Sequence, residues 1–203
     1  VFFSPPTPAT PAPLWSRGLG DVYKRQATQS NITTLKGRGV VIAGPGTGRL
    51  ASGLSGIGRL VETTDLLGYI SYTIGKNGDL AGKTVVVSAG GTVEPIDPVR
   101  VITNHSSGKM GYALAEAARD RGADVVLVTA PTGLPDPALV NVVQVRTAKQ
   151  MGEAIKHHLD EADALVMAAA VADYRPVAAA DQKIKKTEDD LNIPLAKTED
   201  ILM

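Results

Sequence analysis

The chain has 203 residues, in which 21 lysines and arginines balance 21 aspartates and glutamates, and it has no cysteine. This balance lacks the basic excess typical of proteins that bind nucleic acid or membrane surfaces, so we expect neither partner. The absence of cysteine excludes disulfides and thiolate metal sites, and no apolar run reaches membrane-spanning length. Abundant glycine, alanine and valine suit a parallel α/β sheet with buried strands.

Residues 1–26 differ in composition from the rest of the chain. They are rich in proline and hold the only tryptophan and both phenylalanines. They lack the basic start, apolar centre and small-residue cleavage site of a signal peptide. Their last six residues, DVYKRQ, resemble the translation of a transposon-end adapter used in sequencing libraries (GAT GTG TAT AAG AGA CAG). We therefore expect residues 1–26 to be a disordered, non-native segment.

Helices and strands alternate from residue 27 onward. The first part predicts a helix ending near residue 39, a strand at 40–44, a glycine-rich loop and a helix at about 62–71. Residues 73–82 have the composition of a linker. The second part predicts strands at 84–89, 124–130, 140–145 and 163–170, and helices at about 107–121 and 148–159. The first of these helices has apolar residues at helical spacing, namely Met110, Ala113, Leu114, Ala117 and Ala118.

Strands separated by helices predict a doubly wound, mostly parallel, Rossmann-like α/β sheet with helices on both faces. Ligands of such sheets bind outside the carboxyl ends of the strands. The loops after Ala89, Ala130 and Ala170 therefore form the candidate site. The chain stops at TEDILM, within what reads as an unfinished helix. We expect a fragment of a larger gene product, with a sheet truncated at the C-terminus.

The stretch ITNHSSGKMG at 102–111 contains the Gly-Lys pair of a phosphate-binding loop. A P-loop needs a glycine five residues before that pair's glycine and a hydroxyl after the lysine. Thr103 and Met110 stand in those two places, so the stretch is not a P-loop. The dinucleotide fingerprint fails as well, because Gly90 and Gly91 have no third glycine at the right offset and no acidic residue ends the second strand.

The polar residues of this loop favour a more general anion site. Ser106 and Ser107 lie where the helix is expected to begin, and free backbone N–H groups at a helix start favour an anion. Lys109 would add a charge-assisted donor. A plain serine N-cap beside a solvated lysine is the alternative. The loop holds more polar groups than a connection requires, including Arg100, Asn104 and His105.

A second polar cluster follows the last predicted strand. The motif AAAVADYRP presents Asp173, Tyr174 and Arg175 directly after small alanines, which would let a flat ring or a ribose lie against the backbone. Close helix packing over the alanines is the alternative. Further along, the run DQKIKK supplies lysines that either form a solvated loop or neutralise a polyphosphate, namely Lys183, Lys185 and Lys186.

Together these motifs resemble one known family. The sequence SAGGTVEPIDPVRVITNHSSGKMGYALAEAARDRGADVVLVTAPT, with AAAVADYRP and KIKK, is similar to phosphopantothenoylcysteine synthetase over about residues 80–203. In bacteria that synthetase is the ligase half of a bifunctional coenzyme A biosynthesis protein. The other half is a flavin-dependent decarboxylase, whose end is similar to residues 27–72 through ATQSNITTLKGRG and ASGLSGIGR. The expected domains are therefore 27–72, a linker at 73–82 and an incomplete synthetase domain at 83–203.

The resemblance implies a cytoplasmic ligase that joins 4′-phosphopantothenate to cysteine. The family's bacterial members use CTP, with Mg²⁺, and form an acyl-cytidylate with release of pyrophosphate. The resemblance also implies that the intact protein is a homo-oligomer. It alone selects CTP over ATP, and we assign no magnesium ligands. The residues leave two alternatives open, a nicotinamide-dependent oxidoreductase and a non-catalytic nucleotide-binding module.

The resemblance also implies a role for each matching residue. Catalysis is assigned to Asn104, which would stabilise the acyl-cytidylate, to Lys183, which would contact the nucleotide, and to Arg100. Nucleotide binding is assigned to Ser106, Ala168, Ala169, Asp173, Lys183, Asp200 and Ile201. Phosphate or substrate binding is assigned to Gly90, Gly91, Ser107, Gly108 and Lys109. The family's usual TPD is TED here, with Glu199 in place of the proline.

The part of the chain that resembles the decarboxylase departs from that family. Ser52, in the motif ASG, stands where the family has a proton-donating cysteine. A serine hydroxyl is a far weaker acid than a thiol. The family's flavin-binding motifs would lie before residue 27. We expect neither decarboxylase activity nor bound FMN in this chain, whereas the intact bifunctional protein would bind FMN.

Overall fold

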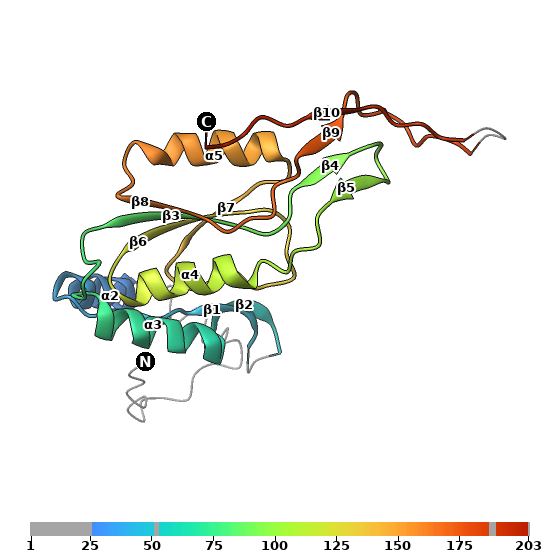
Figure 1. The fold of residues 1–203 in the computed structure, drawn as a ribbon. Helices are drawn as coiled ribbons and strands as arrows, with labels where there is room; N and C mark the ends of the chain where they lie inside the picture. The colour runs from blue at the N-terminus through green and yellow to red at the C-terminus, as the bar shows by residue number, and fades with distance from the viewer. Residues whose placement is uncertain (1–25, 51–52, 187–189, 203) are drawn as a thin grey trace. The chain divides into compact units, whose positions relative to one another are not determined.

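The computed structural model describes residues 26–50, 53–186 and 190–202 (Figure 1). The chain divides into two compact units, Val1–Thr73 and Ile74–Met203, each of which is described by itself. The segment expected to be non-native, 1–26, lies outside the described residues apart from Gln26, and so does Ser52. None of the helices in the described ranges combines the length and the apolar character that crossing a membrane requires.

The first unit contains a hairpin that the sequence analysis missed. Helix α2 (Gln26–Gly37) and helix α3 (Thr63–Gly75) agree with the predicted helices. The strand predicted at 40–44 is wrong, since that apolar run has no strand partner and forms a loop. Instead, β1 (Gly46–Arg49) and β2 (Ser55–Arg59) pair as antiparallel strands within the predicted glycine-rich loop. Glycine is depleted in strands, which explains why its abundance concealed this pair.

The second unit is built on the predicted parallel sheet. Its four strands lie in the order β7–β6–β3–β8, and all neighbouring pairs are parallel. The strands cover β3 (Thr84–Ala89), β6 (Asp124–Thr129), β7 (Asn141–Gln144) and β8 (Ala164–Met167). Helix α4 (Lys109–Asp120) covers one face and helix α5 (Ala148–Leu159) the other (Figure 1). The Rossmann-like, doubly wound fold is confirmed, and the strand order reverses between β3 and β8.

Each face of the sheet has its own hydrophobic core. Alternate residues of a strand point to opposite faces, so Val85 and Val87 pack with α4 while Val86 packs with α5. The predicted apolar face of α4 is wrong, because Met110 and Leu114 are exposed, with 67% and 40% of their surface accessible. The buried face holds Gly111, Tyr112, Ala115, Ala118 and Arg119.

Gly111 sets this rotation of α4. A Cβ atom at Gly111 would lie 2.6 Å from the Cβ of Ala89 and 2.8 Å from the carbonyl oxygen of Ser88. Only a residue without a side chain lets the helix approach strand β3 this closely. The helix therefore turns its smallest residue toward the sheet and leaves Met110 exposed.

Two further strand pairs lie in segments that the sequence analysis assigned to loops. Strands β4 (Val93–Pro95) and β5 (Val101–Thr103) form an antiparallel hairpin inside the predicted loop 90–105. Strands β9 (Tyr174–Pro176) and β10 (Leu195–Lys197) pair across a long excursion. Figure 1 shows both pairs beyond the carboxyl ends of the sheet strands.

Part of the predicted linker at 73–82 is packed within the second unit. A Cβ atom at Gly75 would lie 1.7 Å from the carbonyl oxygen of Asp120, so the backbones are in direct contact. The Leu80 N–H donates to the Arg121 carbonyl at 3.1 Å, and Arg121 forms an ion pair with Asp79. Residues 75–80 thus hold the end of α4, despite their linker-like composition.

Candidate nucleotide-binding site

The start of helix α4 lies two residues later than predicted. The N-cap is Gly108 in the left-handed conformation, with φ of 74°, and the helix begins at Lys109. The Ser106 hydroxyl accepts from the Gly108 N–H at 3.3 Å, and the Ser107 hydroxyl accepts from the Lys109 N–H at 3.5 Å. The two serines therefore shape the turn into the helix, whose positive dipole end lies at Gly108 and Lys109.

Two glycines bring this helix start against strand β3. A Cβ atom at Gly91 would lie 2.7 Å from the Asn104 carbonyl oxygen and 3.4 Å from the Ser106 Cβ. Gly90 has φ of 78° and would meet the Ala130 carbonyl oxygen at 2.7 Å. A side chain at either position would push the loops apart, so glycine is required for this close approach. The structure thus brings the predicted phosphate-binding residues together.

Asn104 connects this region to the end of strand β8. Its Nδ2 donates to the carbonyl oxygens of Ala170, at 3.4 Å, and Val171, at 3.1 Å. Gly91 and Ala170 form a parallel bridge beside this contact. The exposed Asn104 amide therefore lies where the strand order of the sheet reverses, which is the usual ligand position in such sheets.

Two hydroxyls missed by the sequence analysis hold the chain after β8. The fully buried Ser88 accepts at its Oγ from the N–H groups of Ala168 and Ala169, both at 3.1 Å. The buried Thr92 accepts in the same way from the Ala172 N–H at 2.9 Å. The available signal was a serine at the end of the apolar strand TVVVSA. Both predicted alanines are thus fixed through their backbones.

Replacing Ser88 with alanine should lower the free energy of unfolding by about 1–3 kcal/mol, because two backbone N–H groups lose their acceptor. Nucleotide affinity should fall as well, since Ala168 and Ala169 are released. Urea denaturation measures the first effect and CTP titration the second. Ser55→Ala is the control, because Ser55 is exposed and lies in the first unit, away from the residues assigned to the site. Equal stability of wild type and Ser88→Ala would contradict this prediction.

A cavity of about 530 Å³ contains three of the predicted nucleotide-binding residues, namely Asp173, Asp200 and Ile201. Strand β10 returns the chain to this place, with Lys197 opposite Tyr174. The Thr198 N–H then donates to the Asp173 carbonyl oxygen at 2.8 Å. The last described residues form a turn in which Asp200 Oδ1 accepts from the Leu202 N–H at 2.9 Å. Their convergence depends on the β9–β10 pair.

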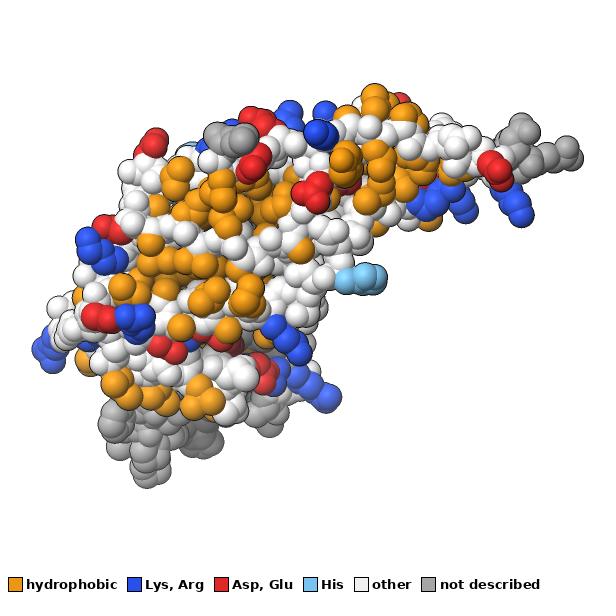
Figure 2. Space-filling model, in the orientation of Figure 1, with side chains coloured by type: hydrophobic (Ala, Val, Ile, Leu, Met, Phe, Trp, Pro, Cys, Tyr) orange, Lys and Arg blue, Asp and Glu red, His pale blue; other side chains and the backbone are white. Residues whose placement is uncertain are grey.

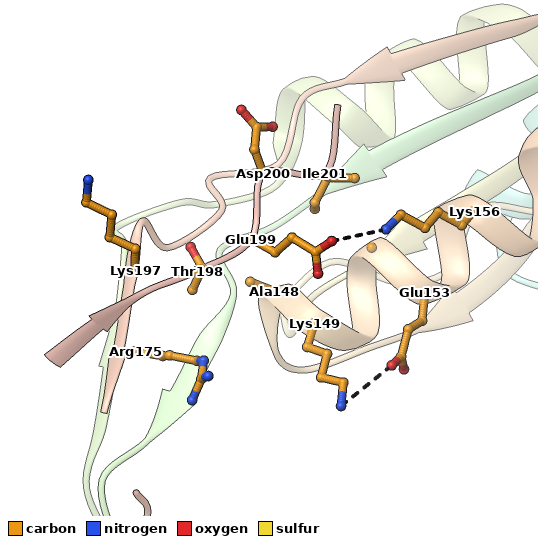
Figure 3. A pocket seen from close by; sticks show the side chains of 11 residues that line it. Ala148, Lys149, Glu153, Lys156, Arg175, Lys197, Thr198, Glu199, Asp200 and Ile201 are labelled. Atoms are coloured by element: carbon orange, nitrogen blue, oxygen red, sulfur yellow. Dashed lines mark ion pairs between the residues drawn. The ribbon is translucent and has the colours of Figure 1, made fainter. Parts of the chain in front are cut away.

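A second cavity, of about 580 Å³, lies on the other side of the segment 197–201, against α5 (Figure 3). Two ion pairs lie in its lining, Lys149 with Glu153 at 3.9 Å and Lys156 with Glu199 at 3.6 Å. The second pair gives a partner to Glu199, the residue at which the resemblance leads us to expect proline. We place the candidate site in the first cavity, because it lies at the carboxyl end of β8.

The structure does not bring Lys183 into either of these cavities. Lys183 is exposed in the excursion between β9 and β10, together with Lys185 and Lys186. Figure 2 shows a group of Lys and Arg side chains on this projecting part of the unit. Among the described residues, no group of three or more His, Asp or Glu is arranged to hold a metal ion.

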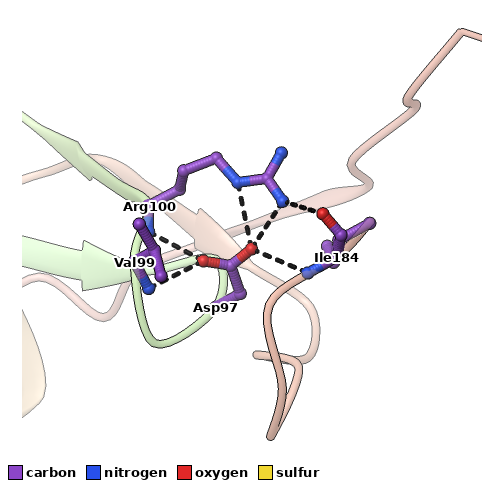
Figure 4. Close-up of polar contacts among 4 residues, drawn as sticks. All are labelled: Asp97, Val99, Arg100 and Ile184. Atoms are coloured by element: carbon purple, nitrogen blue, oxygen red, sulfur yellow. Dashed lines mark hydrogen bonds and ion pairs between the residues drawn. The ribbon is translucent and has the colours of Figure 1, made fainter. Parts of the chain in front are cut away.

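Arg100, the third predicted catalytic residue, is paired with a buried carboxylate (Figure 4). Its Nε and Nη2 donate to Asp97 Oδ2 at 3.0 and 2.7 Å. The Asp97 side chain is fully buried, whereas the Arg100 side chain is 40% exposed. Burial would raise the pKa of Asp97, but three backbone N–H groups and the Arg100 guanidinium hold it well below its ordinary value of 3.8.

This pKa predicts how Asp97 contributes to stability as the pH changes. A carboxyl whose pKa is lower in the folded state stabilises the fold above its unfolded pKa and loses that effect as the pH falls toward the folded value. The stability difference between wild type and Asp97→Asn should thus be constant above pH 5 or so and shrink below about 3.8. Urea unfolding between pH 7 and 3 measures it. A difference that stays constant throughout would contradict the ionised, hydrogen-bonded carboxylate.

The chain is similar to several known proteins. The family model of the DNA/pantothenate metabolism flavoprotein C-terminal domain matches residues 80–203. The coenzyme A biosynthesis bifunctional protein CoaBC of Mycobacterium bovis is 47% identical over 188 residues, which cover 90% of this chain and 45% of that protein. Its counterpart from Vibrio vulnificus is 45% identical over 183 residues, with 89% and 45% covered. The chain thus spans about half the length of these relatives.

Solved structures match about three fifths of the chain. A crystal structure of the C-terminal domain of a CoaBC protein matches with a TM-score of 0.53 and 47% identity, covering 60% of this chain and 56% of that chain. The DNA/pantothenate metabolism flavoprotein from Streptococcus pneumoniae matches with a TM-score of 0.52 and 28% identity, covering 59% and 62%. The family model covers more than half of the chain. The chain therefore belongs to the family of the DNA/pantothenate metabolism flavoprotein C-terminal domain, the synthetase part of CoaBC proteins.

Proposed function

We propose that this chain carries the phosphopantothenate–cysteine ligase domain of coenzyme A biosynthesis. The reaction joins 4′-phosphopantothenate to cysteine. CTP activates the substrate carboxylate as an acyl-cytidylate, pyrophosphate leaves, and the cysteine amine then displaces CMP. Both steps develop negative charge at phosphorus or carbon, so fixed donors and cations would lower the barrier more than a nucleophilic side chain would.

One observation carries the proposal: residues from distant motifs meet at the edge where the strand order reverses. Asn104, after β5, donates to the carbonyl oxygens of Ala170 and Val171 after β8. Asp173, just before β9, and Asp200, three residues after β10, line one cavity there because the two strands pair. This convergence supports a site for a nucleotide with an anionic substrate beside it.

The proposed roles follow from the chemistry available at each place. The start of α4 at Gly108 and Lys109 would bind a phosphate group. An N–H of Asn104 would stabilise the oxyanion of the acyl-cytidylate after leaving one of the two carbonyl oxygens, Ala170 or Val171, to which the amide donates in the free chain. The cavity lined by Asp173, Asp200 and Ile201 would take the nucleoside. Mg²⁺ would neutralise the triphosphate and would be held mainly by the phosphate oxygens and water.

Three finer parts of the proposal come from the family resemblance. They are the choice of CTP over ATP, a cytoplasmic location and a homo-oligomeric state. The lack of decarboxylase activity and of FMN also stays a prediction, because Ser52 lies outside the described residues.

Thermal unfolding of the chain with Mg²⁺ and CTP, ATP or NADP in parallel tests the proposal. A ligand that binds only the native state stabilises it by about 2.7 kcal/mol at a concentration of 100 times its Kd. We expect an increase of the midpoint with CTP that grows when 4′-phosphopantothenate is added. An increase with NADP alone would instead identify a nicotinamide-dependent enzyme. CTP binding that is unaffected by both Asn104→Ala and Lys183→Ala would indicate a non-catalytic nucleotide module.

A further inference from the structure

The tip of hairpin β4–β5 is hydrogen-bonded to the segment that carries Lys183. Asp97 Oδ2 accepts from the backbone N–H of Ile184 at 3.1 Å, and Arg100 Nη2 donates to the carbonyl oxygen of the same residue at 2.6 Å (Figure 4). Both backbone polar groups of Ile184 are thus held by one ion pair. Ile184 directly follows Lys183, so these two hydrogen bonds fix the backbone next to the lysine.

A second contact lies a few residues earlier in the same segment. The Ala180 N–H donates to the Ile96 carbonyl oxygen at 2.9 Å. The chain around Lys183 is therefore attached to the hairpin tip at two points, Ala180 and Ile184. An exposed segment with only surface lysines would otherwise have little to order it, because such residues keep most of their freedom in water.

The hairpin also links the contact between the Asp97–Arg100 ion pair and Ile184 to the candidate site. Arg100 lies four residues before Asn104, and strand β5 runs between them. At about 3.3 Å per strand residue, the tip lies roughly 13 Å from Asn104. A ligand bound at Asn104 could therefore lie along the hairpin toward Lys183. The hairpin thus connects Asn104 and Lys183, two of the three residues to which the family resemblance assigns catalysis.

We propose that Asp97 is a positioning residue that, through Arg100 and Ile184, presents Lys183 to the nucleotide. This inference rests on the proposed function. A purely local role for Asp97 would need only the hydrogen bonds that its Oδ1 accepts from the N–H groups of Val99, at 2.8 Å, and Arg100, at 2.7 Å. The additional bond from the Ile184 N–H to Asp97 joins positions 87 residues apart in the chain, which a turn does not require.

The first experiment measures, without reference to any activity, how strongly the Asp97–Arg100 ion pair holds the segment around Lys183. Trypsin cleavage after Lys183 in the 203-residue chain, followed by mass spectrometry, reports how often this segment opens. Asp97→Asn should accelerate this cleavage by about tenfold, since a neutral amide cannot accept all the bonds of the carboxylate. Asp163→Asn is the matched control, because Asp163 likewise accepts from a lysine, Lys83, and from the backbone N–H of Thr84. It should leave cleavage after Lys183 unchanged.

The second experiment tests whether Asp97 acts through Lys183. CTP affinity is measured for wild type, Asp97→Asn, Lys183→Ala and the double variant. Asp97→Asn should weaken binding by about tenfold in the wild-type background and have almost no effect once Lys183 is alanine. A merely structural effect would be the same in both backgrounds. Asp97→Glu, which keeps the charge, should recover part of the lost affinity.

Several results would overturn the inference. Unchanged cleavage in Asp97→Asn would show that the ion pair does not hold the segment. Additive effects in the double variant, or tighter CTP binding by Asp97→Asn, would show that the Asp97–Arg100 ion pair does not position Lys183 for CTP. If Asp97→Asn is cleaved faster but the wild type does not bind CTP, the proposed function is contradicted, while the attachment of the segment by the Asp97–Arg100 ion pair is established.

Discussion

Asn104→Ala should lower kcat of the ligase reaction by about 10²–10³-fold, the usual effect of removing one donor from an oxyanion site. In the free chain the Asn104 Nδ2 donates to the carbonyl oxygens of Ala170 and Val171, which keeps the amide at the end of β8, and one of these bonds is exchanged for the oxyanion when the ligand binds. Stability should change little, because the side chain is exposed. Product formation under single-turnover conditions and the unfolding midpoint measure the two effects.

Two further variants sharpen this prediction. Asn104→Asp keeps the size of the side chain but cannot donate to the two carbonyl oxygens when ionised, so it should be as inactive as the alanine variant. Asn141→Ala is the matched control, since Asn141 is an exposed asparagine at the start of β7. Full activity of Asn104→Ala would exclude a role for this amide in the reaction.

Lys183→Ala should lower kcat/KM for CTP by about 10²-fold, because a fixed cation beside the triphosphate is lost. The segment supplies its own controls, Lys185 and Lys186, which are equally exposed and lie within three residues. If Lys183 has a specific position, Lys185→Ala and Lys186→Ala should have much weaker effects. A general electrostatic attraction would instead give three similar losses that all disappear at high salt.

Lys183→Arg is a further check on the same residue. The guanidinium keeps the charge but differs in shape and in donor geometry. We expect CTP affinity to recover largely and the rate of chemistry only slightly. Complete recovery of both would reduce the role of Lys183 to that of a charge.

The parallel sheet was predictable because its strands are apolar runs and helices lie between β3 and β6 and between β7 and β8, while a loop joins β6 to β7. TVVVSA and DVVLVT are buried on both faces, and such strands need no particular neighbour to be recognised. The same rule failed at 40–44, where an equally apolar run forms no strand in the structure. Apolar character predicts burial, whereas pairing depends on a partner strand elsewhere in the chain.

The short strands around the site were missed for a related reason. Strands β4, β9 and β10 have only three residues each, and two of them end in proline. Strands β9 and β10 pair across 18 intervening residues, and no local pattern reveals a pairing over that separation. The rotation of α4 was missed because glycine carries no hydrophobic signal, although Gly111 forms the closest contact with β3.

The candidate site was predictable as a set of residues and not as a shape. Motif matching supplied Asn104, Asp173 and Asp200, and the structure brings the last two to one cavity. Lys183 lies instead on the projecting excursion. The supporting hydroxyls of Ser88 and Thr92 could be identified only once their partners were known, because burial alone does not tell which backbone N–H a hydroxyl accepts from.

A rapid-quench experiment without cysteine tests the central claim most directly. Enzyme, Mg²⁺, CTP and 4′-phosphopantothenate are mixed, and pyrophosphate is counted against enzyme. The acyl-cytidylate mechanism predicts a burst of pyrophosphate that needs 4′-phosphopantothenate, needs no cysteine and disappears in Asn104→Ala. Pyrophosphate release only after cysteine is added, or no dependence on 4′-phosphopantothenate, would contradict it.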